Sequence, residues 1–514
     1  AQGRHQEPSQ QYANRQDSDE RLSNAVVDFR FDRDLSSGRD LSIWANASFS
    51  TLDDLWMSYP KYQTVNIPGF GPTWVFAGME PMRPSQKGES QSLVGRYRWL
   101  GDSGIESSVQ LSANRSGFEV NNVIKEERLT FDIDYQSRYS FAAHDLLWGF
   151  SHRSSSDDIT VPGTAYDYLT VQPTAYTQRN SGIFLHDDWT LLPDTLKLGL
   201  GVRWDHASRN GSYVSPNATL LWTPSRSDSL WLKYAQAPRT VARAEQDVSV
   251  FSGVSVSNAR GLSIPTFIFA QPGSQAGLRA ERTQGVEVGY RKQFAPNLSG
   301  DISLYRYHYS DLRGGALTSI NGCSPLFAGL GITFPPTNPA ACPSALQNLP
   351  VYYATSQVSN SLTGWSNGAE ITVDWLATPN WRLQLSYSWS RLDMNEYGNA
   401  FQQNSARLLE KSTPRHHGSL RSQWNIDNKQ QLDLWLRTSA GFERLDAPYT
   451  TTVRVPGYAT LDLRYAYRVD KNLEIALIGR NLVGARRFEY VSDYLATVST
   501  AMQPSLMLTS RWTF

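Results

Sequence analysis

The chain has 514 residues with 48 basic and 48 acidic side chains, so its formal net charge is zero and nothing in it indicates a nucleic-acid-binding surface. Apolar residues make up 40%, below the roughly 45–50% of typical globular proteins, whereas aromatic residues reach 12%. No segment approaches about 18 consecutive apolar residues, which excludes a membrane-spanning helix. Abundant Trp and Tyr in such a polar chain are typical of the aromatic belts at membrane interfaces.

From residue 22 onwards, apolar and polar residues alternate. The odd positions of 27–31 are Val, Phe and Phe, and the even positions of 28–32 are Asp, Arg and Asp. The pattern recurs over 196–205, over 459–468 and in the C-terminal strand, where Trp512 and Phe514 share one face. Successive side chains of a strand point to opposite faces, so each segment has an apolar face and a wet face. This predicts an all-β protein, a transmembrane antiparallel β-barrel closed between lipid and water.

Two kinds of connection separate these segments. Short turn-like breaks alternate with longer connections, notably 53–90, 241–277 and 313–359. Outer-membrane barrels have short turns on the periplasmic side and long loops outside the cell. The breaks fall at 36–38, 101–104, 142–144, 192–194, 224–227, 295–297, 378–380, 427–429 and 469–471. Nine hairpins give 18 strands, and the C-terminal strand makes about 19.

The predicted organisation has two parts. Residues 1–21 are expected to be an extracellular loop or N-terminal remnant, and residues 22–514 the transmembrane barrel. The first residues, Ala1–His5, are polar and carry no signal peptide. Bacterial single-chain barrels normally have an even number of strands, and the last pairs with the first. A count of 19 therefore suggests N-terminal strands outside this chain.

Several motifs resemble those of TonB-dependent outer-membrane receptors, in the order expected for that family. Residues 278–291 resemble the family's "L-x-x-E-x-T … E-x-G" strand, and 298–312 resemble the strand paired with it. Residues 187–189, 201–205 and 238–240 fit a mid-barrel hairpin and the segment after it. Ile478–Leu482 is similar to the "G-x-N-L" hairpin, and Phe514 to the terminal aromatic residue. The resemblance runs from about residue 22 to 514.

The resemblance implies a barrel of the 22-strand receptor type in the bacterial outer membrane. Such receptors also have a plug domain and a TonB box, and neither is visible here. Because about 19 of the 22 strands are counted, about three strands are also expected to be missing. The implied function is energy-coupled uptake of a scarce, bulky nutrient, most often a ferric siderophore and less often cobalamin or another metal chelate. The implied partners are that chelate, the lipid bilayer with its lipopolysaccharide, and TonB acting through the missing plug. A monomer without cofactor is expected.

Candidate ligand-binding residues lie in two of the long connections. Aromatic residues of 53–90 could stack on a chelate, although they could equally pack within the loop. Arginines around 241–277 could grip an anionic complex, although such arginines more often pair with carboxylates in the lumen. The candidates are Trp56, Tyr59, Tyr62, Trp74, Arg239, Arg243, Arg260 and Arg279.

Other polar clusters are weaker candidates. Cys323 and Cys342 are the only cysteines, and both lie in 313–359, so a disulfide that closes this loop is predicted. His416 and His417 are adjacent at a strand start and would face opposite ways, so no metal site is predicted there. Residues 154–158, with Asp167 nearby, are predicted to be a solvated polar loop rather than a calcium site.

No enzyme is predicted, because the chain has no phosphate-binding loop, no zinc-protease motif and no nucleophile elbow. A passive porin or an outer-membrane enzyme remains the alternative. Strand number separates these classes, at about 22 for a receptor, about 16–18 for a porin and about 10–12 for a barrel enzyme. A soluble propeller would show a repeat of roughly 40–50 residues, which is absent.

Overall fold

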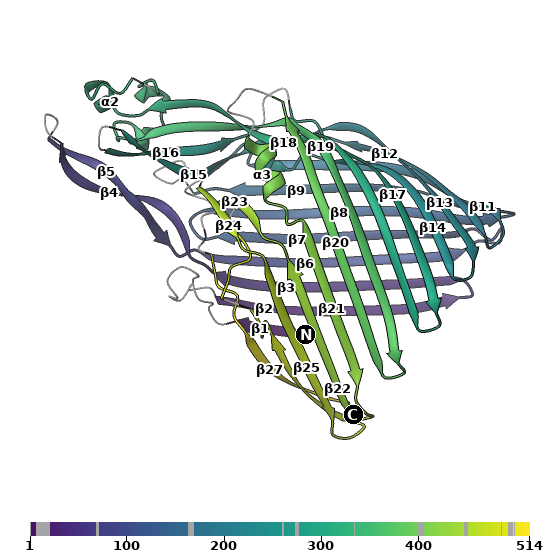
Figure 1. Cartoon of the computed structure of the whole chain (residues 1–514). Coiled ribbons are helices and arrows are strands. Elements are labelled where there is room, and N and C mark those ends of the chain that lie inside the picture. Colours follow the sequence, from purple (N-terminus) through teal and green to yellow (C-terminus); the bar gives the residue numbers. More distant parts are fainter. Residues whose placement is uncertain are drawn as a thin grey trace.

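The computed structural model describes residues 2–6, 21–67, 71–162, 169–259, 262–272, 277–333, 335–397, 404–446, 451–484, 486–491, 497 and 499–513. These form a wide, tilted cylinder of strands with a lobe at one end (Figure 1). No helix in these ranges is long and apolar enough to cross a membrane.

Nineteen strands in the described ranges form the wall, each antiparallel to the next. They are β2 (Arg21–Ser36), β3 (Arg39–Asp53), β6 (Ser85–Leu100), β7 (Glu106–Val120), β8 (Ile124–Phe141), β9 (His144–Thr160), β11 (Ala175–Leu192), β12 (Leu196–Ala207), β13 (Gly211–Ser225), β14 (Asp228–Arg239), β17 (Glu281–Ala295), β18 (Leu298–Gly322), β19 (Tyr352–Thr378), β20 (Trp381–Glu396), β21 (His416–Asn425), β22 (Gln430–Ser439), β25 (Tyr458–Arg468), β26 (Leu473–Arg480) and β27 (Ser505–Trp512). The predicted antiparallel barrel wall is therefore confirmed.

The nine predicted turns all join neighbouring strands at one end of the cylinder, here called the short-turn rim. Residues with positive φ make such tight reversals possible, for example Gly38 at 75° and Asp194 at 58°. A Cβ added to Gly38 would lie 3.0 Å from the Leu100 Cβ, so this turn needs glycine for space as well.

The opposite end, here called the loop rim, carries the remaining elements. Between wall strands lie β4 (Trp56–Ile67) and β5 (Gly71–Met82), β10 (Leu169–Val171), α1 (Arg243–Asp247), β15 (Val248–Ala259) and β16 (Leu262–Gln271), α2 (Leu326–Gly329), η1 (Pro339–Ala341) and η2 (Ser344–Leu346), α3 (Asn404–Lys411), and β23 (Phe442–Asp446) and β24 (Thr451–Val455). Strands β10, β15 and β16 join the wall sheet, in which β16 runs parallel to β19.

The structure corrects the predicted loop limits. The connection predicted over 53–90 is the β4–β5 hairpin and ends where β6 begins at Ser85. The one predicted over 241–277 contains α1, β15 and β16. In 313–359, both ends are extensions of β18 and β19, and α2, η1 and η2 lie between them. In these extensions the apolar–polar alternation stops, but β18 and β19 stay paired because the backbone N–H and C=O groups of each strand bond those of the other.

The N-terminal segment also differs from prediction. Residues 2–6 form a strand, β1 (Gln2–Gln6), that pairs with residues 22–26 of β2 instead of forming a loop. Among the described residues no ladder joins β27 to β1 or β2. An isolated bridge between Trp56 and Thr497 links the segments that follow β3 and precede β27.

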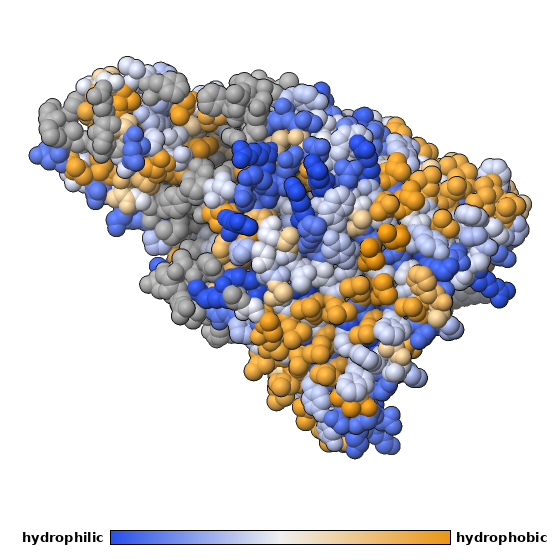
Figure 2. Space-filling model, viewed as in Figure 1, coloured by the Kyte–Doolittle hydropathy of each residue, from blue (hydrophilic) through white to orange (hydrophobic). Residues whose placement is uncertain are grey.

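The two faces of the wall differ as the alternation predicted. On one face of each strand, large apolar side chains are exposed, for example Phe29 (59%), Ile183 (58%) and Leu508 (73%). Figure 2 shows apolar residues covering the lower outer wall, with polar residues gathered nearer the loop rim. Exposed apolar residues on successive wall strands form the band that a lipid-facing barrel requires.

Buried apolar clusters lie mainly at the loop rim, because the wall itself faces lipid and lumen. The largest contains Phe251, Val254, Phe267 and Phe269 with Cys323, Cys342, Leu346 and Val351. Tyr62 and Phe76 of the β4–β5 hairpin pack against it. We call this unit, made of β4–β5, β15–β16 and residues 323–351, the outer lobe.

Candidate functional site

The lumen wall is lined by ion pairs between neighbouring strands. Their side chains are largely exposed, as for Arg98 (60%), so each pair contributes at most about 1 kcal/mol to stability. Their effect is to keep a densely charged surface close to neutral. Examples are Arg98–Asp40, Lys233–Glu287, Arg421–Asp433, Arg437–Asp462 and Arg464–Glu474.

Aromatic rings lie flat on one part of the lumen wall because glycines face them. A Cβ on Gly285 would be 1.9 Å from Tyr307 Cδ1, and one on Gly289 would be 1.9 Å from Trp231 Cζ2. The Tyr305 and Tyr307 ring centroids are 5.1 Å apart, and Trp231 Nε1 donates to Glu287 Oε1 at 2.7 Å. Glycine on the neighbouring strand therefore decides how far these rings reach into the lumen.

Replacing Gly285 with alanine should push the Tyr307 ring off the wall and destabilise the barrel by about 1–3 kcal/mol through overpacking. Thermal unfolding in detergent measures this. Gly95→Ala on β6 is the matched control, because its Cβ would meet nothing within 4 Å. Adding Tyr307→Ala to Gly285→Ala should recover most of the loss, and equal destabilisation by Gly285→Ala and Gly95→Ala would contradict the packing argument.

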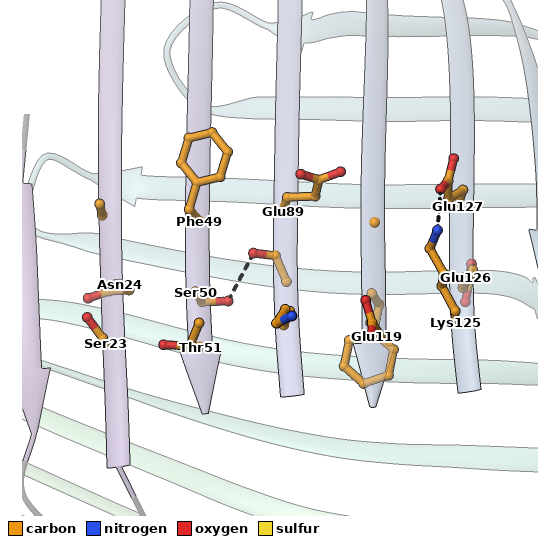
Figure 3. A pocket seen from close by; sticks show the side chains of 15 residues that line it. Ser23, Asn24, Phe49, Ser50, Thr51, Glu89, Glu119, Lys125, Glu126 and Glu127 are labelled. Atoms are coloured by element: carbon orange, nitrogen blue, oxygen red, sulfur yellow. Dashed lines mark hydrogen bonds and ion pairs between the residues drawn. The ribbon is translucent and has the colours of Figure 1, made fainter. Parts of the chain in front are cut away.

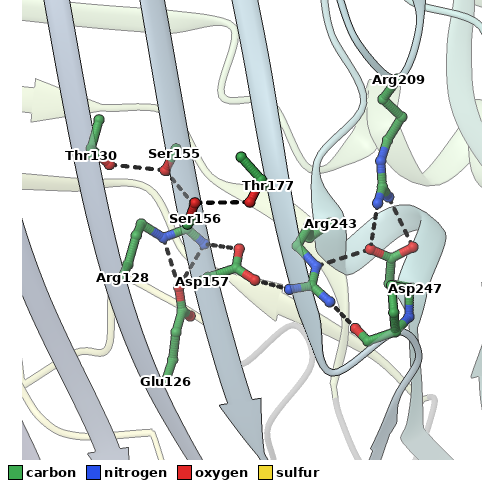
Figure 4. Close-up of polar contacts among 11 residues, drawn as sticks. Glu126, Arg128, Thr130, Ser155, Ser156, Asp157, Thr177, Arg209, Arg243 and Asp247 are labelled. Carbon is green, nitrogen blue, oxygen red and sulfur yellow. Dashed lines mark hydrogen bonds and ion pairs between the residues drawn. The ribbon is translucent and has the colours of Figure 1, made fainter.

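A chain of buried ion pairs fixes α1 inside the loop rim (Figure 4). Arg243 contacts the Asp157 carboxylate of β9 and the Asp247 carboxylate, with Nε 2.9 Å from Oδ2 of Asp247. Asp247 also receives both Nη groups of Arg209 at 2.8 Å, and Arg128 Nη2 lies 3.2 Å from Asp157 Oδ2. The side chains of Arg243 and Asp157 are 8% and 3% exposed. We call this network the mouth brace, because it ties the β15–β16 segment to the wall.

The predicted arginines are therefore engaged with protein groups. The side chain of Arg243 is buried and pairs with Asp157 and Asp247. Arg239 Nη1 lies 2.9 Å from Glu281 Oε2 and its Nη2 2.7 Å from Glu245 Oε1, and the hydrogen bond to Glu245 raises the Arg239 pKa. Arg279 pairs with Asp311 while its side chain stays 73% exposed. Arg260 lies outside the described residues.

Two of the predicted aromatic residues pack within the protein. Trp56 is only 2% exposed, lies against Val120 and Val123, and its Nε1 donates to Asp54 Oδ2 at 2.8 Å. Tyr62 packs edge-on against Phe76 in the outer lobe. Tyr62 therefore follows the alternative in which the loop packs on itself, whereas Trp56 packs against the end of β7 and the turn after it. Tyr59 and Trp74 lie on β4 and β5, and their side chains lie outside what the structure describes.

The two cysteines form a disulfide, with Cα atoms 5.8 Å apart. Both are buried in the core of the outer lobe. The bond closes residues 323–342, so it holds the cap between β18 and β19 against β15 and β16.

Two of the weaker polar candidates, residues 154–158 and His416, lie on strands of the wall. Residues 154–158 belong to β9 rather than to a loop, and Asp157 binds arginines. Asp167 lies outside the described residues. His416 Nδ1 lies 2.7 Å from the Tyr387 hydroxyl. Among the described residues no group of three or more His, Cys, Asp or Glu side chains could hold a metal ion.

A cavity of about 510 Å³ lies at the loop-rim ends of β2, β3, β6, β7 and β8 (Figure 3). It has more carboxylates than cations, with Glu89, Glu119, Glu126 and Glu127 against Lys87 and Lys125. Lys125 Nζ is 2.9 Å from Glu127 Oε1. Arg128 and Arg115 pair with Glu126 and Glu127, so this surface has no excess of cations to attract an anionic chelate, and we do not assign the ligand site to it.

Residues that sequence reasoning missed complete the mouth. Arg313 donates its backbone N–H to Glu281 Oε1 at 2.8 Å and its Nη1 to the Arg279 carbonyl at 2.7 Å. Glu281 is the glutamate of the "L-x-x-E-x-T" motif, so this motif was the available signal. It joins β14, β17 and β18 at the loop rim.

Comparison with known proteins gives one family. The chain matches the family described as "TonB dependent receptor-like, beta-barrel" over residues 3–482. Among curated proteins no sequence relative is found.

Solved structures share the fold at low identity. The siderophore receptor PirA from Acinetobacter baumannii has a TM-score of 0.66 and 12% identity, covering 96% of this chain and 71% of that one. A variant of the ferric enterobactin receptor PfeA from Pseudomonas aeruginosa has a TM-score of 0.65 and 14% identity, covering 98% and 72%. The ferripyoverdine receptor of the P. aeruginosa outer membrane, bound to ferripyoverdine, has a TM-score of 0.65 and 12% identity, covering 99% and 66%.

Proposed function

Because the chain belongs to the TonB-dependent receptor family through its β-barrel, we propose that it is the barrel of an outer-membrane receptor for a scarce, bulky nutrient. Barrels of this family lie in the bacterial outer membrane, and its members are receptors and transporters rather than enzymes. A ferric siderophore is the first candidate ligand. In this proposal uptake is coupled to TonB, and the barrel provides the wall and the mouth.

The observation that carries the proposal is the contrast between the two ends of the lumen. At the short-turn rim the strands are joined by tight turns alone, whereas at the loop rim the mouth brace and the outer lobe hold large structured segments in place. A barrel that captures a dilute ligand needs a pre-formed outer surface of this kind, because ordering a loop on binding costs affinity.

Charge at the mouth supports an anionic ligand. Arg239 and Arg279 keep side chains 55% and 73% exposed although each pairs with a carboxylate. Arginine hydrogen-bonds carboxylate and other oxyanion groups well, so these exposed edges could add contacts to an anionic complex. The named ligands of similar folds, ferric enterobactin and ferripyoverdine, favour siderophores over cobalamin or other chelates.

A passive porin is the second candidate. Nineteen wall strands in the described residues exceed the roughly 16–18 strands of porins. The strand count therefore favours the receptor.

The proposal is tested by deleting the gene that encodes this chain and measuring growth and radioactive iron uptake with defined iron sources. We expect loss of growth on at least one ferric siderophore and recovery when the gene is restored. Arg279→Glu should reduce uptake of that complex, whereas Arg33→Glu, an exposed arginine near the short-turn rim, should not. A deleted strain that uses every siderophore, corrin and chelate as well as its parent would refute the proposal.

A further inference from the structure

One sector of the lumen wall is uncharged, although ion pairs recur between many of the other wall strands. On β18, β19 and β20 the lumen-facing side chains carry no charge over three consecutive rows of the strand register. The rows are Tyr305–Gly368–Ser390, Tyr307–Ser366–Leu392 and Tyr309–Gly364–Met394. Their neighbours Leu304, Trp365 and Tyr387 are exposed on the outer face, which places the three rows in the lumen. We call these nine residues the tyrosine strip.

Charged residues border the tyrosine strip but lie outside its three rows. On the β17 side, Glu287 is opposite Tyr305, and its Oε1 lies 3.3 Å from Lys233 Nζ. Toward the short-turn rim, Glu370 of β19 is opposite Ser388 of β20. The strip is therefore a neutral lane that has charge only along its edges.

Helix α3 marks the outer end of the strip. Ala406 of α3 packs against Met394 of the uppermost row and against Leu362, which lies two residues nearer the loop rim on β19 than Gly364 does. Glu396 of β20 fixes the start of the helix, because its Oε2 accepts the backbone N–H groups of Ser405 and Ala406 at 3.0 and 3.3 Å. Figure 1 shows α3 beside the upper part of β20. The strip therefore begins directly below a structured element of the mouth.

Two tyrosine rings of the strip lie along the wall because glycines flank them. A Cβ on Gly285 of β17 would be 1.9 Å from Tyr307 Cδ1, and one on Gly368 of β19 would be 2.1 Å from Tyr305 Cζ. The two rings therefore cover glycines on opposite sides of β18, with their centroids 5.1 Å apart and their planes 31° apart. A ring that lies along the wall presents its face to the lumen, where it can stack on a planar group.

The strip repeats one kind of contact along the direction of the strand. Tyr305, Tyr307 and Tyr309 are each two residues apart on β18, so successive tyrosines are about 7 Å apart. A molecule that crosses a pore needs contacts strong enough for entry but weak and repeated enough for exit. A series of uncharged aromatic contacts has this property, whereas a strong charge would hold or repel an anionic complex at one point.

We propose that the tyrosine strip is the surface along which the nutrient crosses the barrel, and that this nutrient carries planar rings, as a ferric catecholate does. Its rings would stack on the tyrosine faces, and its oxygen atoms would accept hydrogen bonds from the hydroxyl groups of the tyrosines and of Ser390. The inference rests on the proposed uptake function and adds a route through the lumen to capture at the mouth.

The test compares surface binding with import of a radioactive ferric catecholate in the deleted strain carrying each variant of the whole gene. A stacking contact is worth up to about a factor of ten, so Tyr305→Ser with Tyr307→Ser and Tyr309→Ser should slow import at least about tenfold. Surface binding should not change, because the mouth is intact. Replacing the same three tyrosines with phenylalanine keeps the rings and should retain most of the import rate. Tyr309→Ser by itself should give a smaller loss, which tests the strip even if the triple serine variant does not assemble.

Trp44→Ser is the matched control, because Trp44 is an aromatic residue of the lumen face on β3, on the opposite wall of the cylinder from β20 (Figure 1). Its ring lies between two cations, with Arg30 Cζ and Arg96 Cζ at 5.6 and 5.2 Å from the ring centroid. This variant should import the complex at the wild-type rate. Heat-dependent migration in gels checks that each variant is folded.

Three results would overturn the strip while leaving the proposed function in place. They are import by the serine variants at the wild-type rate, equal losses in the serine and phenylalanine variants, and wild-type import of other ferric complexes but of no ferric catecholate. A wild-type strain that neither binds nor imports any ferric complex would instead refute the proposed function, and the strip with it.

Discussion

Replacing Arg243 with methionine is expected to release α1 and the β15–β16 segment from the wall. Arg243 joins two carboxylates, Asp157 and Asp247, that are nearly inaccessible to water. Breaking a buried ion pair costs about 3–5 kcal/mol, and the lower end applies here because Arg128 and Arg209 still pair with the carboxylates. Amide hydrogen exchange over 243–271 should therefore accelerate by about two orders of magnitude.

Arg382→Met is the matched control for this change. Arg382 pairs with Asp374 on the lumen wall, where the side chains are 50% and 33% exposed. An exposed pair contributes at most about 1 kcal/mol, so exchange in β19 and β20 should change little. If Arg243→Met left exchange over 243–271 unchanged, the mouth brace would not be what holds this segment. Uptake assays on the same variant would then show whether a fixed mouth matters for capture.

Removing the disulfide is expected to loosen the outer lobe and leave the wall intact. Cys323→Ala with Cys342→Ala opens a loop with a sequence separation of 19. Closing a loop of this length lowers the entropy of the unfolded chain and stabilises the folded state by about 3 kcal/mol. Alanine avoids burying an unpaired hydroxyl, because both sulfurs lie in the apolar core of the lobe. The rate of amide hydrogen exchange over 323–351 should rise. The free energy of unfolding of the barrel, measured by thermal unfolding, should stay within about 1 kcal/mol of wild type.

Wild type treated with a reductant provides the control for the cysteine variant. Both should show the same faster exchange over 323–351, since both lose the same covalent closure. Unchanged exchange in the variant would mean that packing of Phe251, Phe267 and Phe269 suffices to hold the cap. A large loss of barrel stability would show instead that the lobe and wall unfold together.

Strand faces and turns were predictable because both are local properties. Side-chain direction alternates along any strand, so parity alone placed Phe29 and Leu508 on the lipid face. Turn residues such as Gly38 act through their own backbone conformation. The extended pairing of β18 and β19 beyond the membrane was missed, because there the apolar–polar alternation stops while backbone pairing continues.

The roles of particular arginines and aromatic residues were not predictable in this way. Arg243 was predicted to be a ligand contact, but its partner Asp157 lies 86 residues away, on a strand brought near by the barrel. Trp56 looks like an exposed loop residue until Val120 and Val123 cover it. Arg437 is near Asp433 in sequence, yet its ion-pair partner is Asp462 on the neighbouring strand.

The amino-acid sequence by itself determined that this chain forms a barrel wall, which residues face lipid and where each short turn falls. It could do so because alternation and turn chemistry depend on residues a few positions apart. Only the tertiary structure decided which charges are paired, which aromatic residues are buried and which arginines remain free. Those outcomes depend on register between strands that are distant in sequence, and register is fixed only when the whole wall is assembled.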